Sequence, residues 1–119
     1  MAQVKIYARK DVWSGRRQEI SDKVHGALVS EWGLPDDKRF HRFFLMDADD
    51  FVAPRSPEYL ILEILCFEGR SDDAKRALHR RLSAEFAEVE ITIVETPKVN
   101  WGIRGVPADE LALTYKVEV

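Results

Sequence analysis

The fold is decided by one stretch of the sequence, residues 59–97, which reads YLILEILCFEGRSDDAKRALHRRLSAEFAEVEITIVETP. Residues 59–67 are almost entirely apolar, which predicts a central strand that is covered on both faces. Ser71 is placed to cap a helix, and apolar side chains recur every four residues behind it, at Ala74, Leu78, Leu82 and Phe86. Residues 89–96 alternate apolar and polar side chains and predict a second strand. The stretch is therefore a β-α-β unit.

The first part of the chain repeats this pattern. Residues 4–8 predict a strand, and residues 39–46 predict another. Between them lies a helical pattern with apolar side chains at Ile20, Val24, Leu28 and Trp32. Gly33 is expected to end that helix in a left-handed cap. Near the end of the chain, the strict alternation of residues 113–119 predicts one further strand.

Two β-α-β units predict a four-stranded sheet with both helices on one face, because such crossovers are right-handed. We therefore expect an α/β (α+β) fold made of a tandem β-α-β repeat with an extra C-terminal strand. The expected organisation is a single domain over residues 1–119, with units at about 1–46 and 59–97 and a tail at 98–119. Two helices leave the other sheet face open, so we expect it to pack against another subunit or a long C-terminal segment.

Composition excludes several classes of partner. The 18 Lys and Arg residues against 21 Asp and Glu give a formal net charge of −3, and no basic stripe is present, so nucleic acid is not an expected partner. No stretch reaches the roughly 20 apolar residues of a membrane helix, and residues 1–10 lack the apolar core of a signal peptide. The expected location is the cytoplasm. The single cysteine, Cys66, is expected to be a buried free thiol.

Metal and cofactor sites are not predicted. No cysteine or carboxylate stands at zinc-ligand spacing from any of the three histidines. We expect His25 and His79 on helix surfaces, whereas His41 lies on a strand end that can border a pocket. A calcium-loop template beginning at Asp47 fails at Phe51 and Val52, where a ligand and a glycine are required.

Two residues have the chemistry of a small-acid site. Arg70 follows Gly69 and precedes a helix N-terminus, where backbone N–H groups and a guanidinium converge on an anion. The alternative is that Arg70 pairs in solvent with nearby acidic side chains, and the local sequence leaves both readings open. Trp101 follows the last strand of the repeat, and either caps the core or forms an apolar wall beside such a site.

Taken together, these segments resemble the tautomerase superfamily, nearest to the long-chain group that contains malonate semialdehyde decarboxylase and cis-chloroacrylic acid dehalogenase. The resemblance spans most of the chain. Its pieces are the opening strand, residues 24–29 and 33–35, residues 67–71 followed by Lys75, and residues 94–97 leading to Trp101.

The resemblance implies a homotrimer whose N-terminal proline is the acid–base group and whose arginine, at the position of Arg70, holds the substrate carboxylate. Trp101, with Ile103, matches the apolar wall of the pocket. Here Ala2 stands at the proline position, and Lys38 stands where the decarboxylase pattern has an aspartate. The second arginine of the pattern falls at Glu68 or Phe67. Decarboxylation and dehalogenation are therefore not expected.

Two functions follow as alternatives. The first is an isomerase, a weak keto–enol tautomerase of a small 2-oxo acid, with Arg70 as the carboxylate ligand. The amine of Ala2 or a water is the expected base, and Lys38 is a further candidate catalytic group. Removal of Met1 would leave a primary amine on Ala2 with a pKa of about 7.7 to 8. The second is a catalytically inactive family member that binds small acids or serves as a scaffold. A ferredoxin-like dimeric barrel has a similar element order and would be excluded by a trimer mass.

Overall fold

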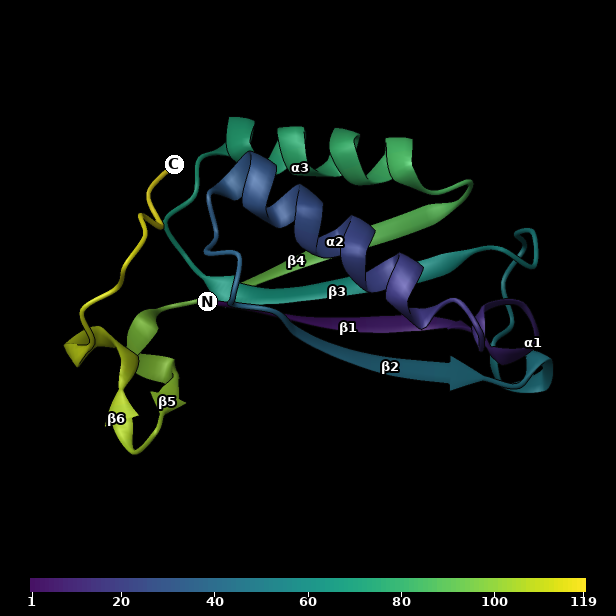
Figure 1. Cartoon of the computed structure of the whole chain (residues 1–119), viewed down its shortest axis with the longest axis horizontal. Helices are drawn as coiled ribbons and strands as arrows, with labels where there is room; N and C mark the ends of the chain where they lie inside the picture. Colours follow the sequence, from purple (N-terminus) through teal and green to yellow (C-terminus); the bar gives the residue numbers. More distant parts are fainter.

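A mixed four-stranded sheet carries two helices on one of its faces (Figure 1). The computed structural model describes all residues from 1 to 119. The sheet has the strand order β2-β1-β3-β4. Its strands are β1 (Ala2–Arg9), β2 (Phe40–Met46), β3 (Leu60–Phe67) and β4 (Val89–Thr96). β1 and β2 are parallel, as are β3 and β4, while β1 and β3 run antiparallel. The tandem β-α-β repeat is confirmed, and its two units join along the β1–β3 pair.

A capping residue sets one end of each long helix. A short helix, α1 (Lys10–Trp13), precedes α2 (Arg17–Trp32), and α3 (Asp72–Glu85) lies in the second unit. Gly33 ends α2 in the left-handed conformation with φ of 67°, as the sequence predicts. The Ser71 hydroxyl accepts a hydrogen bond of 3.1 Å from the backbone N–H of Ala74 and caps α3. None of these helices combines the length and apolar composition required to cross a membrane.

The core lies between the helices and the sheet. All four predicted apolar positions of α2 are buried, and in α3 Leu78 and Leu82 are fully buried. On β3, however, every second residue is buried while Ile61, Glu63 and Leu65 on the other face are only half-buried. The C-terminal tail covers this face only at its end, where it packs on Phe67, so coverage of the rest of the face by another subunit stays a prediction.

The C-terminal segment is not a strand, so the prediction of an extra strand at residues 113–119 is wrong. A two-stranded hairpin, β5 (Gly102–Ile103) and β6 (Val106–Pro107), precedes it, and two 3₁₀ turns (Lys98–Asn100 and Ala108–Glu110) flank the hairpin. The alternation has another cause. Leu111, Leu113 and Tyr115 pack against a small cluster formed by the buried residues Phe67, Ala108 and Val117. The apolar side chains face this cluster and the polar ones face solvent, without a neighbouring strand to pair with.

Candidate functional site

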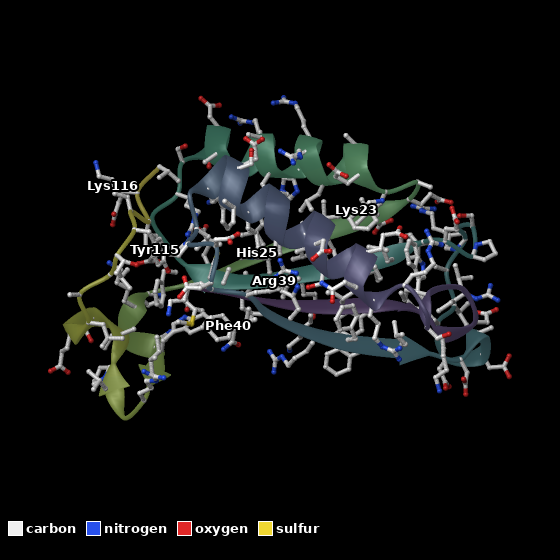
Figure 2. The ribbon with its side chains drawn as sticks, viewed as in Figure 1. Lys23, His25, Arg39, Phe40, Tyr115 and Lys116 are labelled. Atoms are coloured by element: carbon white, nitrogen blue, oxygen red, sulfur yellow. The ribbon has the colours of Figure 1, made fainter.

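A cavity of about 570 Å³ opens at the end of the sheet where β1 begins and the tail folds back. Met1 and Gln3 line it from the start of the chain, Lys38 from the loop before β2 and Phe40 from the first residue of β2. Residues 101–104 and 111–115 form the remaining wall. Phe40 and Tyr115 both lie at this end of the molecule (Figure 2). Eight of the thirteen lining residues are apolar, which is the composition of a small-molecule site.

The apolar wall is held by the end of β4. Trp101 is half-buried and packs edge-to-face on Phe67, with ring centroids 5.1 Å apart. Its indole N–H donates a hydrogen bond to the Thr96 hydroxyl. Ile103, also half-buried, lines the cavity beside it. Both predicted wall residues are therefore brought into the same cavity.

Arg70 is buried and is not one of the residues that line the cavity, but its charge acts on the α-amino group of Met1, which is one of them. The exposed fraction of Arg70 is 4%, so the reading that it pairs in solvent with acidic neighbours is wrong. Its guanidinium carbon is 4.3 Å from the centroid of a Trp32 ring, and Nη1 donates to the Phe67 carbonyl at 3.2 Å. The two other guanidinium nitrogens, Nε and Nη2, are buried and have no hydrogen-bond partner.

Glu95 and Glu118 both act on the charge of Arg70, but neither forms an ion pair with it within 4.0 Å. Glu95 is engaged by Lys75, whose Nζ lies 2.6 Å from the carboxylate. Burial is the main reason that the pKa of Arg70 is lowered from its ordinary value. An arginine that is desolvated and retains free donors is a strong site for an oxyanion, because the N–H groups regain hydrogen bonds when the anion binds.

The α-amino group of Met1 lies close enough to Arg70 to respond to its charge. Burial, and then the Arg70 cation, lower the pKa of this amine from 8.0 to about 5, so the amine is neutral at pH 7. Ala2 is buried in β1 opposite Cys66, and its nitrogen is a peptide N–H as long as Met1 precedes it. The amine at the cavity in this structure is therefore that of Met1.

Lys38 reaches the cavity from the exposed side. Its side chain is 44% exposed, and its Nζ lies 3.8 Å from an Asp37 carboxylate oxygen. It provides a solvated positive charge at the mouth rather than a buried acid–base group.

Tyr115 and Phe40 line the cavity and were not identified from the sequence. The Tyr115 hydroxyl is buried without a hydrogen-bond partner. The signal that could have identified Tyr115 is the alternation of apolar positions in residues 113–119, which by itself predicts a strand.

The histidines lie outside this cavity. His25 is only 2% exposed, so its expected place on a helix surface is wrong, and its Nε2 lies 2.7 Å from the Asp36 carbonyl. His41 Nδ1 lies 2.8 Å from the Ser21 hydroxyl. No group of three or more histidine, cysteine or acidic side chains is arranged to hold a metal ion.

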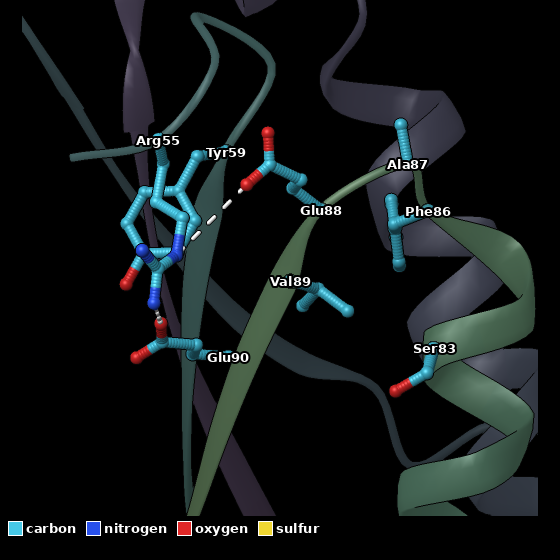
Figure 3. A pocket seen from close by; sticks show the side chains of 8 residues that line it. All are labelled: Arg55, Tyr59, Ser83, Phe86, Ala87, Glu88, Val89 and Glu90. Carbon is cyan, nitrogen blue, oxygen red and sulfur yellow. Dashed lines mark hydrogen bonds and ion pairs between the residues drawn. The ribbon is translucent and has the colours of Figure 1, made fainter. Parts of the chain in front are cut away.

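A second depression, of about 250 Å³, lies at the other end of β4 (Figure 3). Arg55 spans it, with Nη2 at 3.1 Å from the Glu90 carboxylate and Nε at 3.9 Å from that of Glu88. The guanidinium in this depression is paired with two carboxylates, so the depression lacks the unpartnered donors found at Arg70.

The family follows from comparison with known proteins. The family model described as "Tautomerase enzyme" matches residues 38–104, which include β2, the whole second β-α-β unit and the Trp101 wall. The chain belongs to this tautomerase family. A 2-hydroxymuconate tautomerase from Pseudomonas putida is 40% identical over 57 residues, covering 41% of this chain and 90% of that relative.

Solved structures agree with this fold. FG41 malonate semialdehyde decarboxylase inhibited by 3-bromopropiolate superimposes with a TM-score of 0.81 at 25% identity, covering 93% of this chain and 98% of that one. A wild-type R7 fused 4-OT, an asymmetric trimer, superimposes with a TM-score of 0.79 at 18% identity, covering 90% and 96% of the two chains. This tautomerase-family chain therefore has the fold of those enzymes over nearly its whole length.

Proposed function

We propose that this chain catalyses the keto–enol tautomerisation of a small 2-oxo acid, with Arg70 binding the substrate carboxylate. The observation that carries the proposal is the buried guanidinium with two nitrogens that have no partner. A carboxylate that reaches Nε and Nη2 restores both hydrogen bonds and neutralises a desolvated charge. Trp101 and Ile103 then contact the apolar remainder of the acid.

The proton moves through a single acid–base group. In ketonisation, a neutral amine accepts the proton of the enol hydroxyl, the C–C double bond supplies its electron pair to C-3, and the resulting ammonium returns the proton to that carbon. The Met1 amine meets the requirement of being neutral at pH 7 because its pKa is lowered to about 5. Where Met1 is removed, the amine of Ala2 takes its place at the end of β1. Lys38, at the mouth, supplies a cation that attracts the acid.

We extend the proposal to a homotrimer. The open sheet face presents apolar side chains that nothing in the chain covers, among them Ile61, Leu65, Phe44 and Val94. The last two are each 41% exposed. Contact between subunits would remove this surface from water. The trimeric relative supports the same assembly.

The test is turnover of phenylenolpyruvate, followed by ultraviolet absorbance, with the intact mass of the protein recorded on the same sample. Ketonisation faster than in buffer supports the proposal, and the mass shows whether Met1 or Ala2 carries the amine. A folded protein that leaves the rate at the buffer level contradicts it.

A further inference from the structure

The tail is held against the turn that carries Arg70, at the residues on both sides of the arginine. Before it, a Cβ placed on Gly69, whose φ is +133°, would lie 3.3 Å from Val117 Cγ1. After it, the Ser71 N–H donates to the Val119 carbonyl at 3.1 Å. Val117 itself is 1% exposed. The position of the tail is therefore fixed relative to Arg70.

Tyr115 stands two residues before this anchor and forms part of the cavity wall. Its ring packs against both the main core and the cluster of Phe67, Ala108 and Val117. Its hydroxyl is buried and lacks a partner, whereas the hydroxyl of Tyr7, on the open sheet face, donates to Glu63 at 3.0 Å. A buried phenol without a partner is rare, because the unmade hydrogen bond costs free energy.

We infer that the Tyr115 hydroxyl donates a hydrogen bond to the C-2 oxygen of the bound acid and selects 2-oxo acids over plain carboxylic acids. The inference rests on the proposed function, because it takes the carboxylate to be bound by Arg70. A guanidinium alone accepts any carboxylate, so the choice among acids needs a second, fixed polar group at the cavity. Gln3, Lys38, Arg104 and Thr114 also line the cavity with polar side chains, but among all the lining residues Tyr115 is the one whose polar side-chain atom is buried without a hydrogen-bond partner.

The same hydroxyl suits the chemistry. Negative charge develops on the C-2 oxygen as an enolate forms, and a fixed neutral donor in a site that excludes water stabilises it. An acid without the C-2 oxygen leaves the phenol unpaired in the complex and is disfavoured for that reason. Tyr115 is therefore a specificity-determining residue in addition to a wall residue.

The test compares two ligands that differ only at C-2. Phenylglyoxylate is a 2-oxo acid with no hydrogen to enolise, and phenylacetate lacks the 2-oxo group. Calorimetric dissociation constants are measured for the wild type, Tyr115→Phe, Arg70→Ala and, as a matched loss of a phenol hydroxyl elsewhere, Tyr7→Phe. The wild type and Tyr7→Phe are expected to bind phenylglyoxylate with a dissociation constant about tenfold or more below that for phenylacetate. In Tyr115→Phe this ratio is expected to fall to about threefold or less.

The variants separate this inference from the proposed function. If Arg70→Ala weakens both acids while Tyr115→Phe keeps the full preference, the inference is wrong and the proposed function stands. If the wild type binds neither acid, both the inference and the proposed function are wrong. A wild type that binds the two acids equally overturns the inference even when Tyr115→Phe does not fold.

A purely structural role for Tyr115 has its own signature. Tyr115→Phe removes a buried hydroxyl that makes no hydrogen bond, so its midpoint of thermal unfolding without ligand is expected to equal or exceed that of the wild type. A lowered midpoint together with an unchanged ligand preference would assign the residue to packing and overturn the inference.

Discussion

The central guanidinium carbon of Arg70 lies 4.3 Å from the centroid of a Trp32 ring. Trp32 is the last residue of α2, and Arg70 follows β3, so the contact joins the two β-α-β units at the site. The π face of the ring stabilises the Arg70 cation, and this contact uses none of the guanidinium N–H groups. This contact explains how an arginine remains buried with two nitrogens free for a ligand.

Replacing Trp32 by Phe is expected to weaken both the fold and ligand binding. The substitution removes the indole N–H that donates to the Ala74 carbonyl at 3.0 Å, and it shrinks the surface under Arg70. We expect a loss of about 1 to 3 kcal/mol in the free energy of unfolding by urea. We also expect a weaker dissociation constant for phenylglyoxylate. Unchanged affinity in a folded Trp32→Phe protein would show that the ring does not support the arginine.

Alanine at Gly69 is expected to disturb the tail. The left-handed φ of +133° disfavours any side chain, and the new Cβ would press on Val117. A loss of about 1 to 3 kcal/mol in the free energy of unfolding is expected, with faster amide hydrogen exchange in residues 111–119. Gly15→Ala is the control, because no atom lies within 4 Å of its added Cβ. Equal stability of the two variants would contradict the tail contact.

Acid is expected to destabilise the contact between α2 and β2 through His41. Arg39 donates to the Ser21 hydroxyl oxygen at 3.2 Å, so the hydroxyl hydrogen is free to bond His41 Nδ1. Burial, and then the charges of His25 and Arg39, lower the pKa of His41 from 6.5 to about 4. Between these values the unfolded chain binds more protons, so stability falls as the pH drops from 6.5 to 4.

The measurement is urea unfolding of the wild type and His41→Gln at pH 7 and pH 4.5. Between pH 7 and pH 4.5, the free energy of unfolding of the wild type is expected to fall by on the order of 1 kcal/mol more than that of His41→Gln, after allowance for solvent screening. An equal loss in both proteins would show that His41 is not the responsible group.

The pH dependence of turnover is expected to follow the protonation of the Met1 amine. A base whose pKa is lowered to about 5 stays neutral across the neutral range, so kcat/KM is expected to remain level from pH 8 to pH 6 and to fall below about pH 5. Rates are measured on protein whose mass retains Met1. A fall that is centred near pH 8 would show that the amine is not desolvated.

The β-α-β repeat could be predicted from local sequence patterns, whereas the environments of the site residues depend on contacts between distant parts of the chain. The predicted strand at residues 89–96 coincides with β4, and Gly33 ends α2, because periodicity and caps act within a few residues. The burial of Arg70 depends on Trp32 in the other unit, and the environment of His25 depends on Asp36 in the following loop. The tail failed as a strand prediction because alternation reports which side chains face apolar surface, not whether the backbone finds a partner.

The most direct measurement of the central claim is kcat/KM for ketonisation of phenylenolpyruvate by the wild type, Arg70→Ala and Arg76→Ala. Arg76 is an exposed arginine of α3 that pairs with Asp73 at 3.0 Å and is the matched loss of a guanidinium away from the cavity. Loss of one charged partner of a buried oxyanion costs roughly 2 to 5 kcal/mol, so Arg70→Ala is expected to lower kcat/KM by about thirtyfold or more. Arg76→Ala is expected to match the wild type. Equal values for all three proteins would contradict carboxylate binding by Arg70.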